Sequence, residues 1–269
     1  MTAPALPASL ISVNGIQLAY QSFGEGGPAP LVLLHGGFGS VEMFGSNVAT
    51  LAAGRRVLGV DLQSHGRSPA ADRPMTFESM ADDIAELIGT LTAGQADVLG
   101  FSLGGAVALR LGIQHPDRVR RLVLVSTPPR RSGWHPEMTA GMDAMGPHTA
   151  DILRATPVYG GYEAIAPDPA GWPTLVTQLT TQLHVDYDWS AEAAALPMSV
   201  MLVAGDADGM PPRTAVEFFE LLGGGQRDAS WDRSGMTRHR LAILPGVTHY
   251  DINVSPALPA AVIPFLDEA

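Results

Sequence analysis

Short apolar runs alternate with longer helix-like segments along most of this chain of 269 residues. The short runs are almost continuously apolar, as in strands that are buried on both faces of a sheet. They are PLVLLH (30–35), RVLGVD (56–61), ADVLGF (96–101), RLVLVS (121–126), SVMLVAG (199–205) and RLAILPG (240–246). Strands of this kind, separated by helices, predict a parallel sheet that helices cover.

The segments between these runs support the same interpretation. Residues 77–91 place apolar side chains at helical spacing and acidic ones on other faces, which predicts an amphipathic covering helix. Residues 103–115 are apolar all round and stop before Pro116, as in a helix packed inside a protein. Asn14-Gly15 lies between two strand-like runs in 10–22 and predicts a β-hairpin. We therefore expect an α/β fold with a mostly parallel central sheet of about eight strands and helices on both faces.

One segment interrupts the alternation. Residues 127–196 are rich in Pro, Gly, Met, Trp and Tyr and lack clear strand runs, although they lie between two predicted strands. We expect a helical cap inserted into a core domain formed by residues 1–126 and 197–269. Aromatic and methionine side chains of the cap are candidates for lining a substrate pocket, although such residues often only pack: Trp134, Met142 and Tyr159.

Composition narrows the choice of partners. The formal net charge of −11 argues against nucleic acid and anionic membranes, which attract clusters of Lys and Arg. The chain has no cysteine, so disulfides, thiolate metal sites and thiol nucleophiles are excluded. The first ten residues lack the basic start of a secretory signal, and no apolar run is long enough to span a bilayer. We expect a cytoplasmic protein, either a monomer or a homodimer; the glycine-rich segment 223–239 has no assigned role.

The stretch VLGFSLGG (98–105) places Ser102 between Gly100 and Gly104, where a buried strand ends and a helix begins. A serine on such a tight turn needs small neighbours, because larger side chains would collide. A serine hydroxyl also needs a base to accept its proton and an acid to orient that base. Acids follow the run at 199–205, and His249 follows the last strand, so the order is serine, acid, histidine.

With these segments the chain resembles the α/β-hydrolase superfamily, in particular its cap-bearing serine esterase and lactonase (cofactor-free haloperoxidase-like) branch. The resemblance covers nearly the whole chain. The motifs that carry it are LLHGGFGS (33–40), DLQSHGRS (61–68), GFSLGG (100–105), GDADGMPP (205–212) and GVTHY (246–250), in the order of the family.

The resemblance implies a role for each candidate residue. Ser102 is the expected nucleophile, His249 the general base and then acid, and Asp208 the carboxylate that orients the imidazole. Asp206 is the alternative acid, and we prefer Asp208 because the family usually places its acid three residues beyond the glycine that closes this strand, here Gly205.

The same resemblance implies that two backbone N–H groups stabilise the oxyanion of the reaction. The expected donors are Gly37 and Leu103. Phe38 is an alternative to Gly37, because HGGF can be aligned with a shift of one residue, and its ring is also a candidate wall of the pocket.

These roles predict hydrolysis of a carboxylic ester or lactone of a small, neutral, fairly apolar substrate by water, with no cofactor and no metal. The alternative is a C–C bond hydrolase of ring-cleavage products, whose acidic substrates need a positive anchor. Arg130, Arg131 and Arg154 are the candidates for that anchor. A ligand-binding receptor with residual hydrolysis is a third hypothesis, from a different functional class.

Overall fold

The computed structural model describes residues 8–268 and opens with the expected hairpin. Strand β1 (Ser9–Val13) pairs antiparallel with β2 (Ile16–Phe23). Asn14 and Gly15 join them with φ angles of 44° and 83°, and a type I′ turn needs positive φ at both positions. The expectation that the chain starts without a secretory signal falls mostly on residues 1–7, which lie outside the described residues.

Eight strands form one sheet in the order β1-β2-β4-β3-β5-β6-β7-β8. β2 is antiparallel to β4, and all neighbouring pairs from β4 to β8 are parallel, so the predicted fold class is confirmed. Every residue of β3, β4 and β5 is buried, which explains their continuous apolar sequences. The bounds are β3 (Leu31–Leu34), β4 (Val57–Asp61), β5 (Ala96–Phe101), β6 (Val119–Val125), β7 (Ser199–Ala207) and β8 (Arg240–Thr248).

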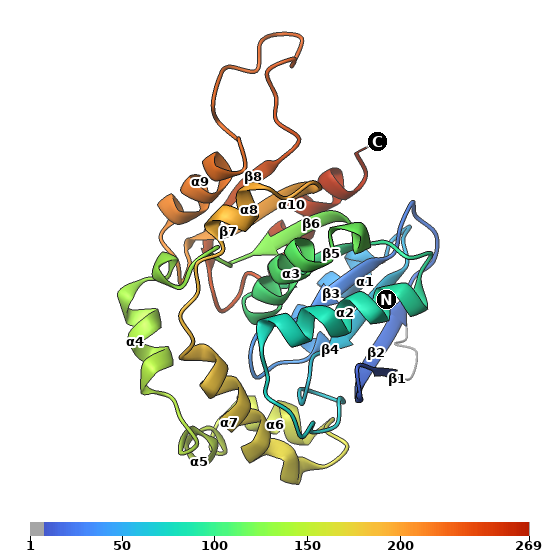
Figure 1. Cartoon of the computed structure of the whole chain (residues 1–269), viewed down its shortest axis with the longest axis vertical. Helices are drawn as coiled ribbons and strands as arrows, with labels where there is room; N and C mark the ends of the chain where they lie inside the picture. Colours follow the sequence, from blue (N-terminus) through green and yellow to red (C-terminus); the bar gives the residue numbers. More distant parts are fainter. Residues whose placement is uncertain (1–7, 269) are drawn as a thin grey trace.

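Helices cover both faces of the sheet (Figure 1). α2 (Phe77–Leu91), α3 (Leu103–Gln114) and α9 (Pro212–Leu221) contribute to a buried cluster on one face. α1 (Asn47–Leu51) and α10 (Ala257–Leu266) contribute to a second cluster on the other. Two short 3-10 helices, η1 (Val41–Phe44) and η2 (Pro116–Arg118), lie in the connections. None of the helices described in residues 8–268 is long and apolar enough to cross a membrane.

The chain between β6 and β7 is helical, and α4 to α7 lie together at one end of the molecule (Figure 1). The apolar face of α7 joins the same buried cluster as α2 and α3. Trp172 is fully buried, and its indole N–H donates to the Ala150 carbonyl at 2.9 Å. The elements are η3 (Arg131–Gly133), α4 (Pro136–Ala144), α5 (Thr149–Leu153), α6 (Pro157–Glu163), η4 (Pro169–Gly171), α7 (Trp172–Leu183) and α8 (Ser190–Ala194).

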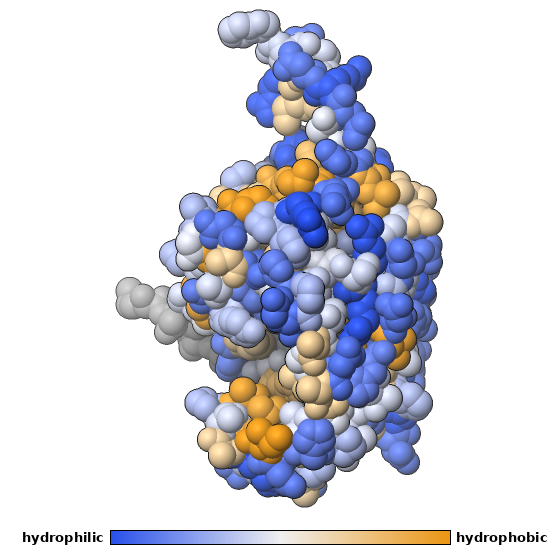
Figure 2. Space-filling view, turned by 90° about the vertical axis from the view of Figure 1, so that its left-hand side faces the viewer, coloured by the Kyte–Doolittle hydropathy of each residue, from blue (hydrophilic) through white to orange (hydrophobic). Residues whose placement is uncertain are grey.

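The glycine-rich segment 223–239 connects α9 to β8 and projects from the body of the molecule (Figure 1). Its surface is mostly hydrophilic (Figure 2), although the side chain of Trp231 is fully exposed. Hydrogen bonds across the segment shape it, including one from the N–H of Gly235 to the Ala229 carbonyl at 2.9 Å. This loop lies at the opposite end of the molecule from α5 and α6.

Candidate active site

Ser102 lies at the sharp turn between β5 and α3, where the backbone is strained. Its φ is 53° and its ψ is −114°, a conformation that non-glycine residues rarely adopt. The Ser102 N–H donates to the Val125 carbonyl at 3.0 Å, which ties the turn to the neighbouring strand β6. A serine held on such a turn presents its hydroxyl above the carboxyl edge of the sheet.

Close backbone contacts require the two glycines that flank Ser102. A Cβ at Gly100 would overlap the carbonyl oxygen of Gly104. A Cβ at Gly104 would overlap the carbonyl oxygens of Leu34 and His35. Helix α3 therefore approaches β5 at Gly100 and the end of β3 at Gly104 only because both positions lack side chains, which is the collision that the sequence pattern predicted.

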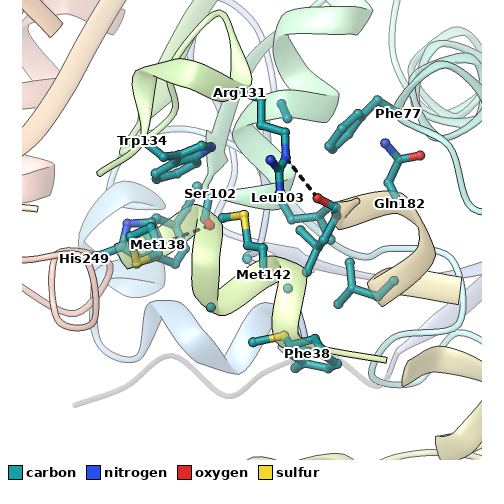
Figure 3. Close-up of a pocket in the computed structure, with 18 of the residues that line it drawn as sticks. Phe38, Phe77, Ser102, Leu103, Arg131, Trp134, Met138, Met142, Gln182 and His249 are labelled. Carbon is teal, nitrogen blue, oxygen red and sulfur yellow. Dashed lines mark hydrogen bonds between the residues drawn. The ribbon is translucent and has the colours of Figure 1, made fainter. Parts of the chain in front are cut away.

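Hydrogen bonds join Ser102, His249 and Asp208, although the three residues come from distant parts of the chain. Asp208 follows β7 and His249 follows β8. His249 Nδ1 lies 2.9 Å from Asp208 Oδ1, and His249 Nε2 lies 3.1 Å from Ser102 Oγ (Figure 3). Because an ionised carboxylate only accepts hydrogen bonds, Nδ1 carries the proton and Nε2 accepts from the serine hydroxyl.

The carboxylate of Asp208 is buried and surrounded by donors. Its oxygens also accept hydrogen bonds from the Ser126 hydroxyl and from the N–H groups of Gly205 and Gly209, the last two at 3.0 and 2.6 Å. Burial by itself would raise the pKa of Asp208, but the hydrogen bonds from His249 and the other donors outweigh it and hold that pKa below its usual value. The carboxylate is therefore ionised at neutral pH and able to stabilise a positive imidazole beside it.

Asp206, the alternative acid, makes a different contact. Its side chain is exposed, and Oδ1 accepts a hydrogen bond from the Gly246 N–H at 2.8 Å. It makes no hydrogen bond to His249 within the described part of the chain. Asp206 therefore joins the carboxyl ends of the neighbouring strands β7 and β8, whereas Asp208 contacts the imidazole.

Backbone N–H groups are available beside Ser102. Leu103 is the first residue of α3, so its N–H has no acceptor within the helix. Gly37 and Phe38 lie on the loop after β3, and both line the same cavity as Ser102 and Leu103. Phe38 has a φ of 58°, so this loop turns sharply at the residue where the two alignments of HGGF differ. Gly37 and Phe38 both remain candidates for the second oxyanion donor.

A cavity of about 400 Å³ lies over Ser102, and its walls are mostly apolar (Figure 3). Three of the four expected pocket residues line it, namely Phe38, Trp134 and Met142. Tyr159 is not among the lining residues. Its ring packs edge-on against Trp172, with centroids 5.4 Å apart, and its hydroxyl donates to Glu163 at 2.9 Å.

Sequence reasoning missed other lining residues, among them Phe77, Gln182 and Tyr187. Gln182 carried a detectable signal, because it falls three and seven positions after the buried residues Leu179 and Leu175 of α7. Phe77 had been placed on a covering helix, and Tyr187 lies in a loop without periodicity. Neither position could be assigned to the cavity without knowing how α2 and the cap pack together.

Only one of the three arginines considered as anchors lines the cavity. Arg131 does so (Figure 3), and its guanidinium donates to Asp143 in α4 and to the carbonyl of Leu183, the last residue of α7. Arg130 instead forms an ion pair with Glu217 at 2.9 Å. Arg154 lies over the ring of Tyr159, 5.1 Å from its centroid.

Comparison with known proteins agrees with this architecture. A family model described as alpha/beta hydrolase fold matches residues 29–157. The sn-1-specific diacylglycerol lipase of Danio rerio is 36% identical over 153 residues, or 55% of this chain and 48% of the relative, so the chain spans about half the length of that curated relative. The 2-hydroxymuconate semialdehyde hydrolase of Pseudomonas sp. strain CF600 is 28% identical over 233 residues, which cover 78% of this chain and 80% of the relative.

Solved structures extend the likeness to nearly the whole chain. The enol-lactonase of Burkholderia xenovorans LB400 superposes with a TM-score of 0.72 at 24% identity, covering 97% of this chain and 100% of its own. A hydrolase from Pseudomonas aeruginosa PA01 has a TM-score of 0.69 at 26% identity, with coverages of 97% and 99%. The fold of this chain is therefore similar to that of these proteins over nearly its whole length.

Proposed function

We propose, from the premise that this chain belongs to the α/β-hydrolase superfamily, that it is a serine hydrolase acting on a carboxylic ester or lactone. Ser102, His249 and Asp208 form the catalytic triad in this proposal. The observation that carries it is the pair of hydrogen bonds, at 2.9 and 3.1 Å, that links the three side chains. Relatives named lipase, hydrolase and enol-lactonase support a hydrolytic reaction.

The reaction proceeds in two halves. In the first, His249 Nε2 takes the hydroxyl proton of Ser102 as Oγ attacks the carbonyl carbon, and the N–H groups of Leu103 and of Gly37 or Phe38 stabilise the oxyanion. His249 then protonates the leaving alcohol oxygen, its C–O bond breaks, and an acyl-enzyme remains. In the second half, His249 takes a proton from water, the hydroxide attacks the acyl carbon, and Ser102 Oγ leaves as it regains its proton.

The walls of the cavity indicate the substrate class. Apolar side chains such as Trp134, Met142 and Leu179 make up most of the lining around Ser102. A small, neutral and fairly apolar ester or lactone suits such a surface, because charged groups lose their hydration there. We further propose that residues 127–196 form a cap over this cavity and that the protein is located in the cytoplasm.

Hydrolysis of a C–C bond is the second candidate. The observation that favours it is the likeness to 2-hydroxymuconate semialdehyde hydrolase over 78% of this chain. Arg131 lines the cavity and is the available cation for an acidic substrate. The same serine, histidine and aspartate would serve this reaction, so the two candidates differ in substrate and not in the triad.

Turnover of chromogenic esters tests the proposal. Wild type should hydrolyse p-nitrophenyl acetate and butyrate, and Ser102→Ala or His249→Ala should lower kcat by about 10⁴-fold or more, because each residue acts only as part of the triad. A panel of lactones and a ring-cleavage dienoate would follow. If no compound shows serine-dependent turnover while ligands still bind, the receptor hypothesis replaces the enzyme.

A further inference from the structure

The wall of the cavity away from His249 contains an amide that no other protein group among the described residues binds. Gln182 is 4% exposed and lines the cavity, yet its side chain makes no hydrogen bond to any residue between 8 and 268. In Figure 3 its amide lies beside Phe77, on the opposite side of the cavity from His249. Most polar side chains this far enclosed have a protein partner, so this amide distinguishes Gln182 from the other buried polar residue of its helix.

The position of Gln182 on α7 strengthens this interpretation. Leu175 and Leu179, on the same face of the helix, are fully buried and apolar. Thr180 is the other buried polar residue of α7, and its hydroxyl donates to the Val176 carbonyl at 2.8 Å. Thr180 is therefore satisfied within its own helix, whereas Gln182 is not. The amide of Gln182 opens to the cavity, so its donor and acceptor atoms are available to a polar group that binds there.

The charges near the cavity favour a neutral group as that partner. The guanidinium of Arg131 donates to Asp143 at 2.6 Å and to the Leu183 carbonyl at 3.3 Å. Glu137 lines the same cavity. Because Asp143 already balances Arg131 and Glu137 adds a negative charge, a carboxylate entering this region would meet no excess of positive charge.

We propose that Gln182 binds a neutral hydrogen-bonding group of the substrate, a carbonyl or a hydroxyl, remote from the carbonyl that Ser102 attacks. An amide both donates and accepts, so it serves either group. This inference rests on the proposed hydrolase function and narrows its substrates to esters or lactones that carry a second polar group. It also disfavours the dienoate carboxylate as the group bound at this wall.

Three isosteric p-nitrophenyl esters provide the test: those of 5-oxohexanoate, 5-methylhexanoate and glutarate, which end in a ketone, a methyl branch and a carboxylate. Wild type should favour the ketone over the methyl branch by about tenfold in kcat/KM, as expected for one net hydrogen bond. Gln182→Met, which keeps the size of the side chain without its amide, should remove that preference. Met142→Leu, a matched change in the apolar wall, should keep it.

An unchanged preference in Gln182→Met would overturn the inference, and so would a preference of wild type for the glutarate ester over the ketone. Binding separates this failure from failure of the hydrolase proposal. The methyl esters of 5-oxohexanoate and 5-methylhexanoate are titrated by calorimetry into Ser102→Ala with and without Gln182→Met. A Gln182-dependent gain for the ketone supports the inference even without turnover in wild type, whereas turnover without that gain overturns the inference alone.

Discussion

Four donors converge on the carboxylate of Asp208, and one of them is the hydroxyl of a residue with unusual backbone geometry. Ser126 follows the end of β6, is fully buried and has a positive φ of 52°. Its hydroxyl donates to Asp208 Oδ2, while His249 donates to Oδ1. A hydroxyl held in this way restricts the rotation of the carboxylate, so we interpret Ser126 as a positioning residue that acts through Asp208.

Exchange of either acid for its amide tests which one orients His249. Asp208→Asn should lower kcat for p-nitrophenyl butyrate by about 10⁴-fold, because an amide nitrogen cannot accept from Nδ1–H and favours the wrong tautomer. Asp206→Asn is the matched control, since its amide oxygen still accepts from the Gly246 N–H. Steady-state kinetics of both variants decide the assignment, and a larger loss in Asp206→Asn would contradict it.

At the scale of elements, the site depends on how closely α3 approaches the end of β3. The N–H of Gly104 donates to the His35 carbonyl at 3.0 Å, so the first turn of α3 rests directly on the loop after β3. That loop carries Gly37 and Phe38. The contact between helix and loop therefore sets the distance from the Ser102 hydroxyl to the N–H groups of Gly37 and Phe38, the two candidates for the second oxyanion donor.

A methyl group at this contact should damage stability and activity together. Gly104→Ala should lower the free energy of unfolding by about 1–3 kcal/mol or more, because the new Cβ meets backbone oxygens that cannot move aside. Gly160→Ala in α6 is the matched control: its Cβ would meet nothing within 4 Å, and alanine should stabilise the helix by about 0.5–1 kcal/mol. Urea unfolding of both variants measures the difference, and equal effects would contradict the packing argument.

At the scale of the whole molecule, two buried histidines join the loops after β3 and β4. His35 Nδ1–H donates to the Gly36 carbonyl at 2.7 Å, and Nε2 accepts from the Leu62 N–H at 3.0 Å. His65 Nδ1–H donates to the Gln63 carbonyl at 2.8 Å, and its ring lies 5.1 Å from that of His35. Both rings are neutral in this arrangement: a protonated His35 Nε2 could not accept from the Leu62 N–H, and burial lowers the pKa of His65.

This pair makes the folded state sensitive to acid. Burial first, and then the neighbouring His35, lower the pKa of His65 from 6.5 to about 3. Below its ordinary pKa the unfolded chain binds a proton that the folded protein does not bind, so stability is complete above that pKa and is lost as the pH falls. Between about pH 7.5 and about pH 5, His65 alone should reduce the free energy of unfolding by about 2 kcal/mol.

Denaturant titrations at the two pH values measure this loss. His65→Asn keeps a donor for the Gln63 carbonyl but removes the titrating ring, so its stability should depend less on pH by about that amount, whatever its absolute stability. Each protein is compared with itself at two pH values, so any loss of unfolding free energy that the smaller side chain causes at both pH values cancels. The same pH dependence in His65→Asn and wild type would show that other groups cause the acid sensitivity.

Local patterns predicted most of the architecture because they depend on neighbours in sequence. All six apolar runs became strands, and Asn14-Gly15 formed the turn of the hairpin. The strand predicted over RLVLVS (121–126) differs at both ends from β6, which begins at Val119 and ends at Val125. Its last predicted residue, Ser126, leaves the strand with positive φ to reach Asp208, a contact with a residue 82 positions away.

The sequence by itself determined the succession of strands and helices along the chain and the position of a serine between two glycines. It also determined that an acid and a histidine follow later strands. These features follow from periodicity and backbone sterics, which act over a few residues. Only the tertiary structure decided that Asp208 contacts His249, that Tyr159 turns toward Trp172 and that Gln182 faces the cavity. Those outcomes depend on how helices of the inserted segment rotate and pack against the sheet, and such contacts join residues that no local pattern relates.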